Sequence, residues 1–225
     1  MDVRKNIAFF QNQFAGKICR LVAVSKTHPV EKIKEAYDAG QRIFGENKVQ
    51  EMCAKQPSLP PDIEWHLIGH LQTNKVKQIV PFVSLIHSVD SFKLLEEINK
   101  QGKKINRVIS CLLQVYIANE ETKFGLDEME LFELIKSDKI ASLDSVKVLG
   151  LMGMATFTDN KDQVRMEFRE LKNLFDKIRG MSLPSNIEMK ELSMGMTQDY
   201  EIAIEEGSTL VRIGTAIFGS RKFLG

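Results

Sequence analysis

A lysine near the start of the sequence and a glycine-rich segment near its end carry the clearest chemical signals. Lys26 follows the apolar run 21–24, and a lysine at the end of such a run can lose solvation and act as a nucleophile. Gly, Ser and Thr residues cluster in segments 193–197 and 214–219, a composition that suits phosphate binding. An amine beside a phosphate cradle indicates a ligand that carries both a carbonyl group and a phosphate.

Pyridoxal 5'-phosphate (PLP) fits that description best, and the role predicted for Lys26 is a Schiff base with its aldehyde. The candidate phosphate ligands are Ser193, Gly195, Gly214 and Thr215. Asn47 follows an apolar run and has two interpretations: contact with the bound ring or imine, or the cap of a helix over 48–54.

Arg212 is a charged residue within an otherwise apolar strand. Strand alternation places it on the opposite face from Val211 and Ile213. One interpretation is a structural ion pair with Glu188 or Glu191. The other is a donor to the pyridine nitrogen of PLP, and a guanidinium there would keep that nitrogen unprotonated and weaken PLP as an electron sink.

Short β-branched runs alternate with amphipathic helical patterns along the chain, which predicts a parallel sheet. The predicted strands are 21–24, 42–44, 64–67, 84–86, 107–115, 146–150, 187–192 and 210–213. The clearest predicted helices are 30–39, 126–135 and 161–178. Eight strands favour a single closed (β/α)8 TIM barrel over residues 1–225. The alternative is an open doubly wound sheet, which the missing GxGxxG turn disfavours for a nucleotide binder.

A (β/α)8 barrel would bring these residues together, because its active groups sit at the carboxyl ends of the strands. Lys26 follows the first predicted strand and Asn47 the second. Ser193 follows the seventh, and Gly214 and Thr215 follow the eighth. Phosphate sites in such barrels are typically built by the loops after strands seven and eight.

Composition narrows the functional class. The 225 residues include 31 basic and 30 acidic side chains, a net charge of +1 that gives no argument for nucleic acid or an anionic membrane surface. Cys19, Cys53 and Cys111 show neither metal spacing nor a disulfide framework, so we predict free thiols and no metal site. With no apparent signal peptide and no apolar stretch of about 20 residues, we expect a cytoplasmic protein without a membrane span.

Three further polar residues receive less specific predictions. His66 and His70 could form an acid/base pair, but structural or rim roles are favoured because no carboxylate stands at metal spacing. Lys123 lies in a polar loop after the fifth strand, where a solvated lysine is favoured over a ligand contact.

The sequence resembles the pyridoxal phosphate homeostasis proteins, which look like the barrel domain of alanine racemase standing alone. The matching segments are 23–27, 44–51, 65–69, 71–75, 150–152, 192–196 and 207–219. The resemblance implies a barrel of the alanine racemase N-terminal-domain type. It places the Schiff base on Lys26, the ring-nitrogen contact on Arg212, and the phosphate on Ser193, Gly214 and Thr215. It also implies buffering or delivery of intracellular PLP.

A carrier is therefore expected rather than an enzyme, with PLP-dependent apo-enzymes as possible partners and a monomeric state. A racemase needs two opposed bases, and the sequence ends at Gly225 without the second domain that supplies one in alanine racemase. One alternative is a PLP-dependent enzyme with weak racemase-like activity, using His66, Tyr116 or Tyr200 as acid or base. The other is a cofactor-free Schiff-base aldolase acting on a phosphosugar.

Overall fold

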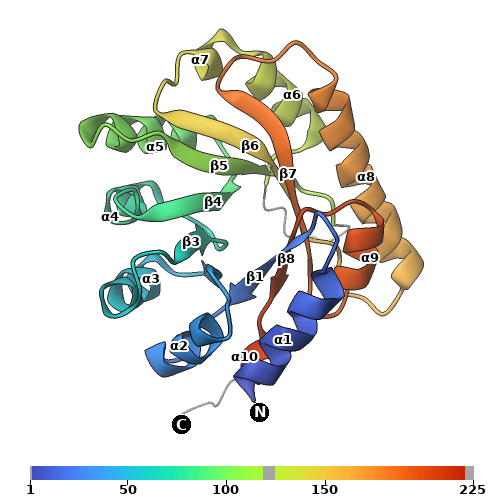
Figure 1. Ribbon diagram of the computed structural model, residues 1–225. Helices are drawn as coiled ribbons and strands as arrows, with labels where there is room; N and C mark the ends of the chain where they lie inside the picture. The colour runs from blue at the N-terminus through green and yellow to red at the C-terminus, as the bar shows by residue number, and fades with distance from the viewer. Residues whose placement is uncertain (1, 119–124, 221–225) are drawn as a thin grey trace.

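A closed barrel of eight parallel strands forms the centre of the computed structural model, which describes residues 2–118 and 125–220 (Figure 1). The strands pair in sequence order, and β1 pairs with β8 to close the barrel. Their bounds are β1 Arg20–Val24, β2 Ile43–Glu46, β3 Glu64–Leu67, β4 Val83–Val89, β5 Ile109–Gln114, β6 Val146–Met152, β7 Ile187–Met196 and β8 Leu210–Ile213. The predicted (β/α)8 barrel is confirmed, and the open doubly wound sheet is wrong.

Helices surround the barrel (Figure 1). Those before β5 are α1 Val3–Phe14, α2 Val30–Asp38, α3 Val49–Lys55, α4 Val76–Ile79 and α5 Phe92–Lys104, with short 3₁₀ turns η1 Gln56–Ser58 and η2 Thr73–Lys75. Those after it are α6 Glu128–Lys136, α7 Asp138–Ala141, α8 Lys161–Arg179, α9 Tyr200–Glu205 and α10 Thr215–Phe218. In the part of the chain with described structure, no helix is both long and apolar enough to cross a membrane.

The apolar side chains form two cores, because successive residues of a strand point to opposite faces. The larger core lies between the strands and the helices and includes Leu21, Ala23, Phe44 and Trp65. The smaller core fills the barrel interior. Its buried members are Val22, Ile43, Leu85, Leu112, Met152 and Leu210. Within a strand, the residue two positions beyond an interior residue also faces the interior, one layer nearer the carboxyl-end mouth of the barrel.

Strand β6 contains a bulge that changes which face its residues present. Val148 and Leu151 both belong to the outer core although they are three residues apart, and Met152 belongs to the interior core. Gly150 lies between them with φ +149°, where the register of β6 against β7 shifts. A glycine adopts this backbone readily, so it can carry the bulge that turns Met152 inward.

Candidate functional site

Polar side chains gather inside the barrel at the carboxyl ends of the strands. Interior Leu85, Leu112 and Leu210 are followed two residues later by His87, Gln114 and Arg212, which share their inward direction. His66 and Ser193 also point inward, because both neighbours of each in its strand belong to the outer core. All five polar side chains are buried: His66, His87, Gln114, Ser193 and Arg212. A layer of buried polar side chains therefore lies at the mouth of the barrel, and the apolar interior core lies below it.

Arg212 of β8 is bonded within this layer to Ser193 of β7 and to Gly153, the residue that follows β6. Its Nη1 donates to Ser193 O at 2.9 Å and to Ser193 Oγ at 2.5 Å, and its Nη2 donates to Gly153 O at 3.1 Å. The inward orientation predicted for Arg212 is confirmed, with only 4% of the residue exposed. The alternative ion pair is wrong, since Glu191 pairs with Arg20, and Glu188 pairs with Lys147 and Lys190.

The protonation state of Arg212 is settled by its surroundings. Burial lowers the pKa of the guanidinium to about 10, and nearby Asp199 opposes this shift. Arg212 therefore remains a cation at neutral pH. Its three hydrogen bonds use three of five N–H donors, so two N–H groups can still serve an acceptor atom of a ligand.

Two buried histidines extend the hydrogen bonds of Arg212 across the barrel. His87 Nδ1 lies 2.9 Å from Ser193 Oγ, and His87 Nε2 lies 2.9 Å from His66 Nδ1. Burial, and to a lesser extent Arg20, lowers the pKa of His66 to about 3. Burial and the neighbouring His66 and Arg212 hold the pKa of His87 well below its ordinary value. Both imidazoles are neutral at physiological pH and act as hydrogen-bonding groups.

The buried histidines predict a loss of stability in acid. An unfolded His66 takes up a proton below about pH 6.5, whereas the folded one resists protonation until about pH 3. The contribution of neutral His66 to the free energy of unfolding is therefore fully present above pH 6.5, and it is lost as the pH falls toward 3. We expect His66→Gln to make the free energy of unfolding less dependent on pH, by up to about 1.4 kcal/mol per pH unit in that window. Urea unfolding between pH 4 and 7 measures how the free energy of unfolding changes with pH. His70→Gln, at an exposed histidine, is the control. An equal change with pH in wild type and His66→Gln would contradict the prediction.

Ser193, a predicted phosphate ligand, is placed where its hydroxyl serves Arg212. The residue is fully buried, and Oγ is already bonded to Arg212 and His87. These contacts favour a positioning role for the side chain, and the phosphate contact stays a prediction.

Ser193→Ala separates the two roles. Removing the hydroxyl leaves His87 and Arg212 each short of a buried partner, so we expect the free energy of unfolding to fall by about 1–3 kcal/mol. A phosphate contact predicts, in addition to this loss, a reduced preference for PLP over pyridoxal; a positioning role alone leaves that preference unchanged. Urea unfolding and titration with both compounds give the answer, with the exposed Ser142→Ala as control.

Lys26 lies just beyond β1, in step with the interior-facing Val22 and two residues past Val24. The residue is half-buried and occupies the turn that leads toward α2. Its place at a strand end on the barrel mouth agrees with the prediction for a nucleophilic lysine.

Asn47 lies one residue beyond β2, and its helix-cap interpretation is wrong. The cap of α3 is Lys48, which makes no side-chain capping bond. A Cβ on Gly69 would come within 2.9 Å of Asn47 Cα, so this glycine allows the β2 and β3 loops to pack closely. Asn47 is thereby fixed, half-buried, at the same end of the barrel as Lys26.

Gly214 and Thr215 follow β8, which neighbours β1. A Cβ on Gly214 would lie 3.1 Å from Val24 O, so the end of β8 approaches the end of β1 closely. Thr215 is exposed and begins α10, whose first N–H groups have no acceptor within the helix. The structure thus brings Gly214 and Thr215 beside the strand that ends near Lys26.

The other polar candidates lie in different places. His70 is an exposed side chain with Nδ1 3.5 Å from Asp90. Lys123 lies outside the described residues.

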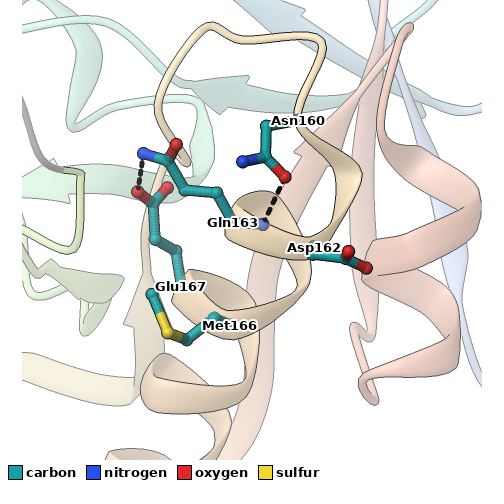
Figure 2. A pocket seen from close by; sticks show the side chains of 5 residues that line it. All are labelled: Asn160, Asp162, Gln163, Met166 and Glu167. Carbon is teal, nitrogen blue, oxygen red and sulfur yellow. Dashed lines mark hydrogen bonds between the residues drawn. The ribbon is translucent and has the colours of Figure 1, made fainter.

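Figure 2 shows a surface pocket at the start of α8 that contains none of the predicted ligands. Its described lining residues are Asn160, Asp162, Gln163, Met166 and Glu167. Asn160 caps the helix by accepting from Gln163 N, and Glu167 accepts from the Gln163 side chain at 3.0 Å. Glu167 also holds Thr156 N and Oγ1, each at 2.7 Å. These bonds fasten the loop after β6, a structural role that accounts for the pocket's polar groups.

Sequence reasoning gave no role to four polar residues next to the predicted ligands. Besides His87, they are Glu46, Glu51 and Lys55, which surround the turn that carries Lys26. Their positions in β2 and α3 gave no periodic signal, because a buried ion pair has no distinct sequence pattern.

Comparisons with known proteins identify the family of the chain. Residues 2–222 match the family described as alanine racemase, N-terminal domain. A pyridoxal phosphate homeostasis protein of Aquifex aeolicus is 45% identical over 210 residues, covering 92% of this chain and 90% of the relative. One of Pasteurella multocida is 39% identical over 237 residues, covering 99% of both chains.

A solved structure gives the same result. PipY of Synechococcus elongatus, determined with PLP bound, superposes with a TM-score of 0.85 at 35% identity, covering 96% of this chain and 100% of PipY. Since relatives of this identity span nearly the whole chain, and the barrel of alanine racemase type is present, the chain belongs to the pyridoxal phosphate homeostasis protein family.

Proposed function

We propose that this chain binds PLP reversibly at the carboxyl-end mouth of its barrel and acts in PLP homeostasis, buffering the cofactor or delivering it. PLP supplies an aldehyde that can condense with an amine, with loss of one water. Lys26 offers that amine. The observation that carries the proposal is the buried Arg212 inside the barrel, a fixed cation with two N–H donors available to a ring acceptor.

The donor set around the mouth fits this ligand. Arg212 donates to the pyridine nitrogen and does not give up its proton, because its pKa of about 10 keeps it charged. Gly214 and Thr215 hold the phosphate through the first N–H groups of α10 and the Thr215 hydroxyl. Ser193 fixes Arg212, and Asn47 contacts the ring from the β2 side.

We further propose that the protein is a carrier rather than an enzyme. Racemisation of a PLP-bound amino acid needs two acid/base groups on opposite sides of the reacting carbon, so a second group is needed besides Lys26. His66 is buried below the mouth with a pKa of about 3. The Tyr200 ring packs against Phe10 and Phe14 of α1, on the outer side of the barrel. Tyr116 lines a surface pocket with residues of α6 and α8. The described positions of these three candidate bases support a carrier.

The remaining parts of the proposal concern the whole protein. We propose that residues 1–225 form one PLP-binding domain that acts in the cytoplasm as a monomer, with PLP-dependent apo-enzymes as recipients. Neither nucleic acid nor membrane is among the proposed partners, in line with the net charge of +1.

An absorption spectrum of the purified protein, before and after borohydride, tests the proposal. We expect a visible band once PLP is added, loss of that band on reduction, and a peptide carrying the reduced adduct on Lys26. A protein that stays colourless with PLP, but is trapped by borohydride with a phosphosugar, would instead support the aldolase. Racemase turnover at typical enzyme rates, about 1–1000 per second, would refute the carrier.

A further inference from the structure

Lys26 lies in a tight turn with an unfavourable backbone conformation. His28 N donates to Ser25 O at 3.1 Å, which closes a four-residue turn with Lys26 in second position. Thr27, in third position, has φ +67°, the sign that type II turns reserve for glycine or asparagine. A β-branched residue is strained there, because its Cβ crowds the backbone. Contacts from outside the turn must therefore hold it.

Three charged side chains from β2 and α3 form hydrogen bonds with the residues that flank Lys26 and with one another. Glu51 Oε1 accepts from Thr27 N at 2.5 Å. Lys55 Nζ donates to Ser25 O at 2.9 Å, and also to Glu46 Oε1 and Glu51 Oε1, both at 2.7 Å. Ser25 Oγ donates to the same Glu46 oxygen at 2.6 Å. We name Glu46, Glu51 and Lys55 the turn clamp.

Stability alone does not explain the turn clamp, because burying its charges costs free energy of desolvation. The Glu46 side chain is fully buried and that of Lys55 is 8% exposed, so both charges have left water. The second oxygen, Glu46 Oε2, is buried without a hydrogen-bond partner among the described residues. Apolar side chains of similar volume often stabilise such a position as well or better. The gain therefore lies in the geometry that the charges impose on residues 25 and 27, which flank Lys26.

We propose that the turn clamp is a set of positioning residues that holds the strained turn and so aims Lys26 Nζ at the mouth of the barrel. This inference rests on the proposed function of Lys26. The condensation forms a C=N bond to Nζ and releases one water, and its rate depends on how well Nζ is placed before the reaction. The contacts of the clamp described above are made with Ser25 and Thr27, the residues on either side of the lysine.

Glu51 is the member best suited to a test, because its side chain is 23% exposed and its loss leaves the buried pair intact. We expect Glu51→Ala to slow the growth of the visible band after PLP addition roughly tenfold, since the strained Thr27 N–H loses its acceptor. Glu51→Gln keeps a carbonyl oxygen and should restore most of the rate. Glu35→Ala, which removes a surface partner of Lys32 in α2, is the matched control.

Thr27→Gly shows whether the effect arises from strain. Glycine adopts a positive φ without penalty, so the turn should keep its shape without the clamp. In the Thr27→Gly background we expect Glu51→Ala to slow the band by less than about twofold. An equal slowing in both backgrounds, or a Glu51→Ala rate equal to that of wild type, overturns the inference. Failure of the proposed function is recognised separately, because the wild-type protein would then form no band on Lys26.

Discussion

Lys26→Ala is expected to abolish covalent PLP attachment and the visible band, and to weaken PLP binding roughly 100-fold, or about 2.7 kcal/mol. The amine at the end of β1 is the group that bonds to the aldehyde. The contacts of Arg212, Gly214 and Thr215 with the ring and phosphate should persist, so weak noncovalent binding should remain. Equilibrium dialysis gives the affinity, and borohydride trapping followed by mass mapping gives the covalent site.

Two further variants separate chemistry from charge. Lys26→Arg keeps a cation but removes a nucleophilic amine, so we expect it to behave as Lys26→Ala does in borohydride trapping. Lys48→Ala changes an exposed lysine that precedes α3 and should retain the band. A reduced adduct that forms on another lysine in Lys26→Ala at the wild-type rate would contradict the assignment.

Gly150→Ala is expected to lower the free energy of unfolding by about 3 kcal/mol or more, and to prevent folding if that exceeds the protein's reserve. The φ of +149° at Gly150 is strained for any residue with a Cβ. The added Cβ would also overlap the Glu191 carbonyl of β7, since it would stand 2.8 Å from the carbonyl carbon. This neighbour is backbone within a strand and cannot rotate away. Thermal and urea unfolding measure the loss.

Gly180→Ala is the matched control for this prediction. Gly180 ends α8 with φ −79°, and a Cβ there would meet the backbone oxygens of Asp176 and Lys177 at 3.6 Å, an ordinary contact. We expect its stability to equal or exceed that of wild type, because alanine lowers the entropy of the unfolded chain. Equal stability of the Gly150 and Gly180 variants would show that the bulge of β6 does not need glycine.

The sequence predicted the barrel because eight short β-branched runs alternate with amphipathic helical patterns. The strands 64–67 and 210–213 were placed with the bounds that the structure shows. The strands predicted at 84–86 and 187–192 were too short, because β4 continues through His87 and β7 through Ser193. Polar residues that face the interior near the mouth look in sequence like the start of a loop.

The placement of the site residues was predictable where strand order and alternation decide it, as with Lys26 after β1 and the inward-facing Arg212 of β8. It was not predictable where the role arises from tertiary contact. Lys55 lies in α3 and reaches Ser25 O only because β1 and β2 pair side by side. Ser193 was assigned to the phosphate because it is a hydroxyl residue at a strand end, but its partners Arg212 and His87 come from other strands, β8 and β4.

The hydrogen bonds of Arg212 to Ser193 and Gly153 also limit which residues can replace it during evolution. Electron withdrawal by PLP is greatest when the ring nitrogen is protonated, and an acidic residue at position 212 would favour that state. Such a change would also remove the donors that tie Gly153 and Ser193 to β8 and would bury a carboxylate in their place. If the proposed function is correct, a single substitution of Arg212 that favours catalysis would therefore also lower the stability of the fold. Substitutions among the residues bonded to Arg212 would have to come first, so that the loss of the arginine does not destabilise the protein.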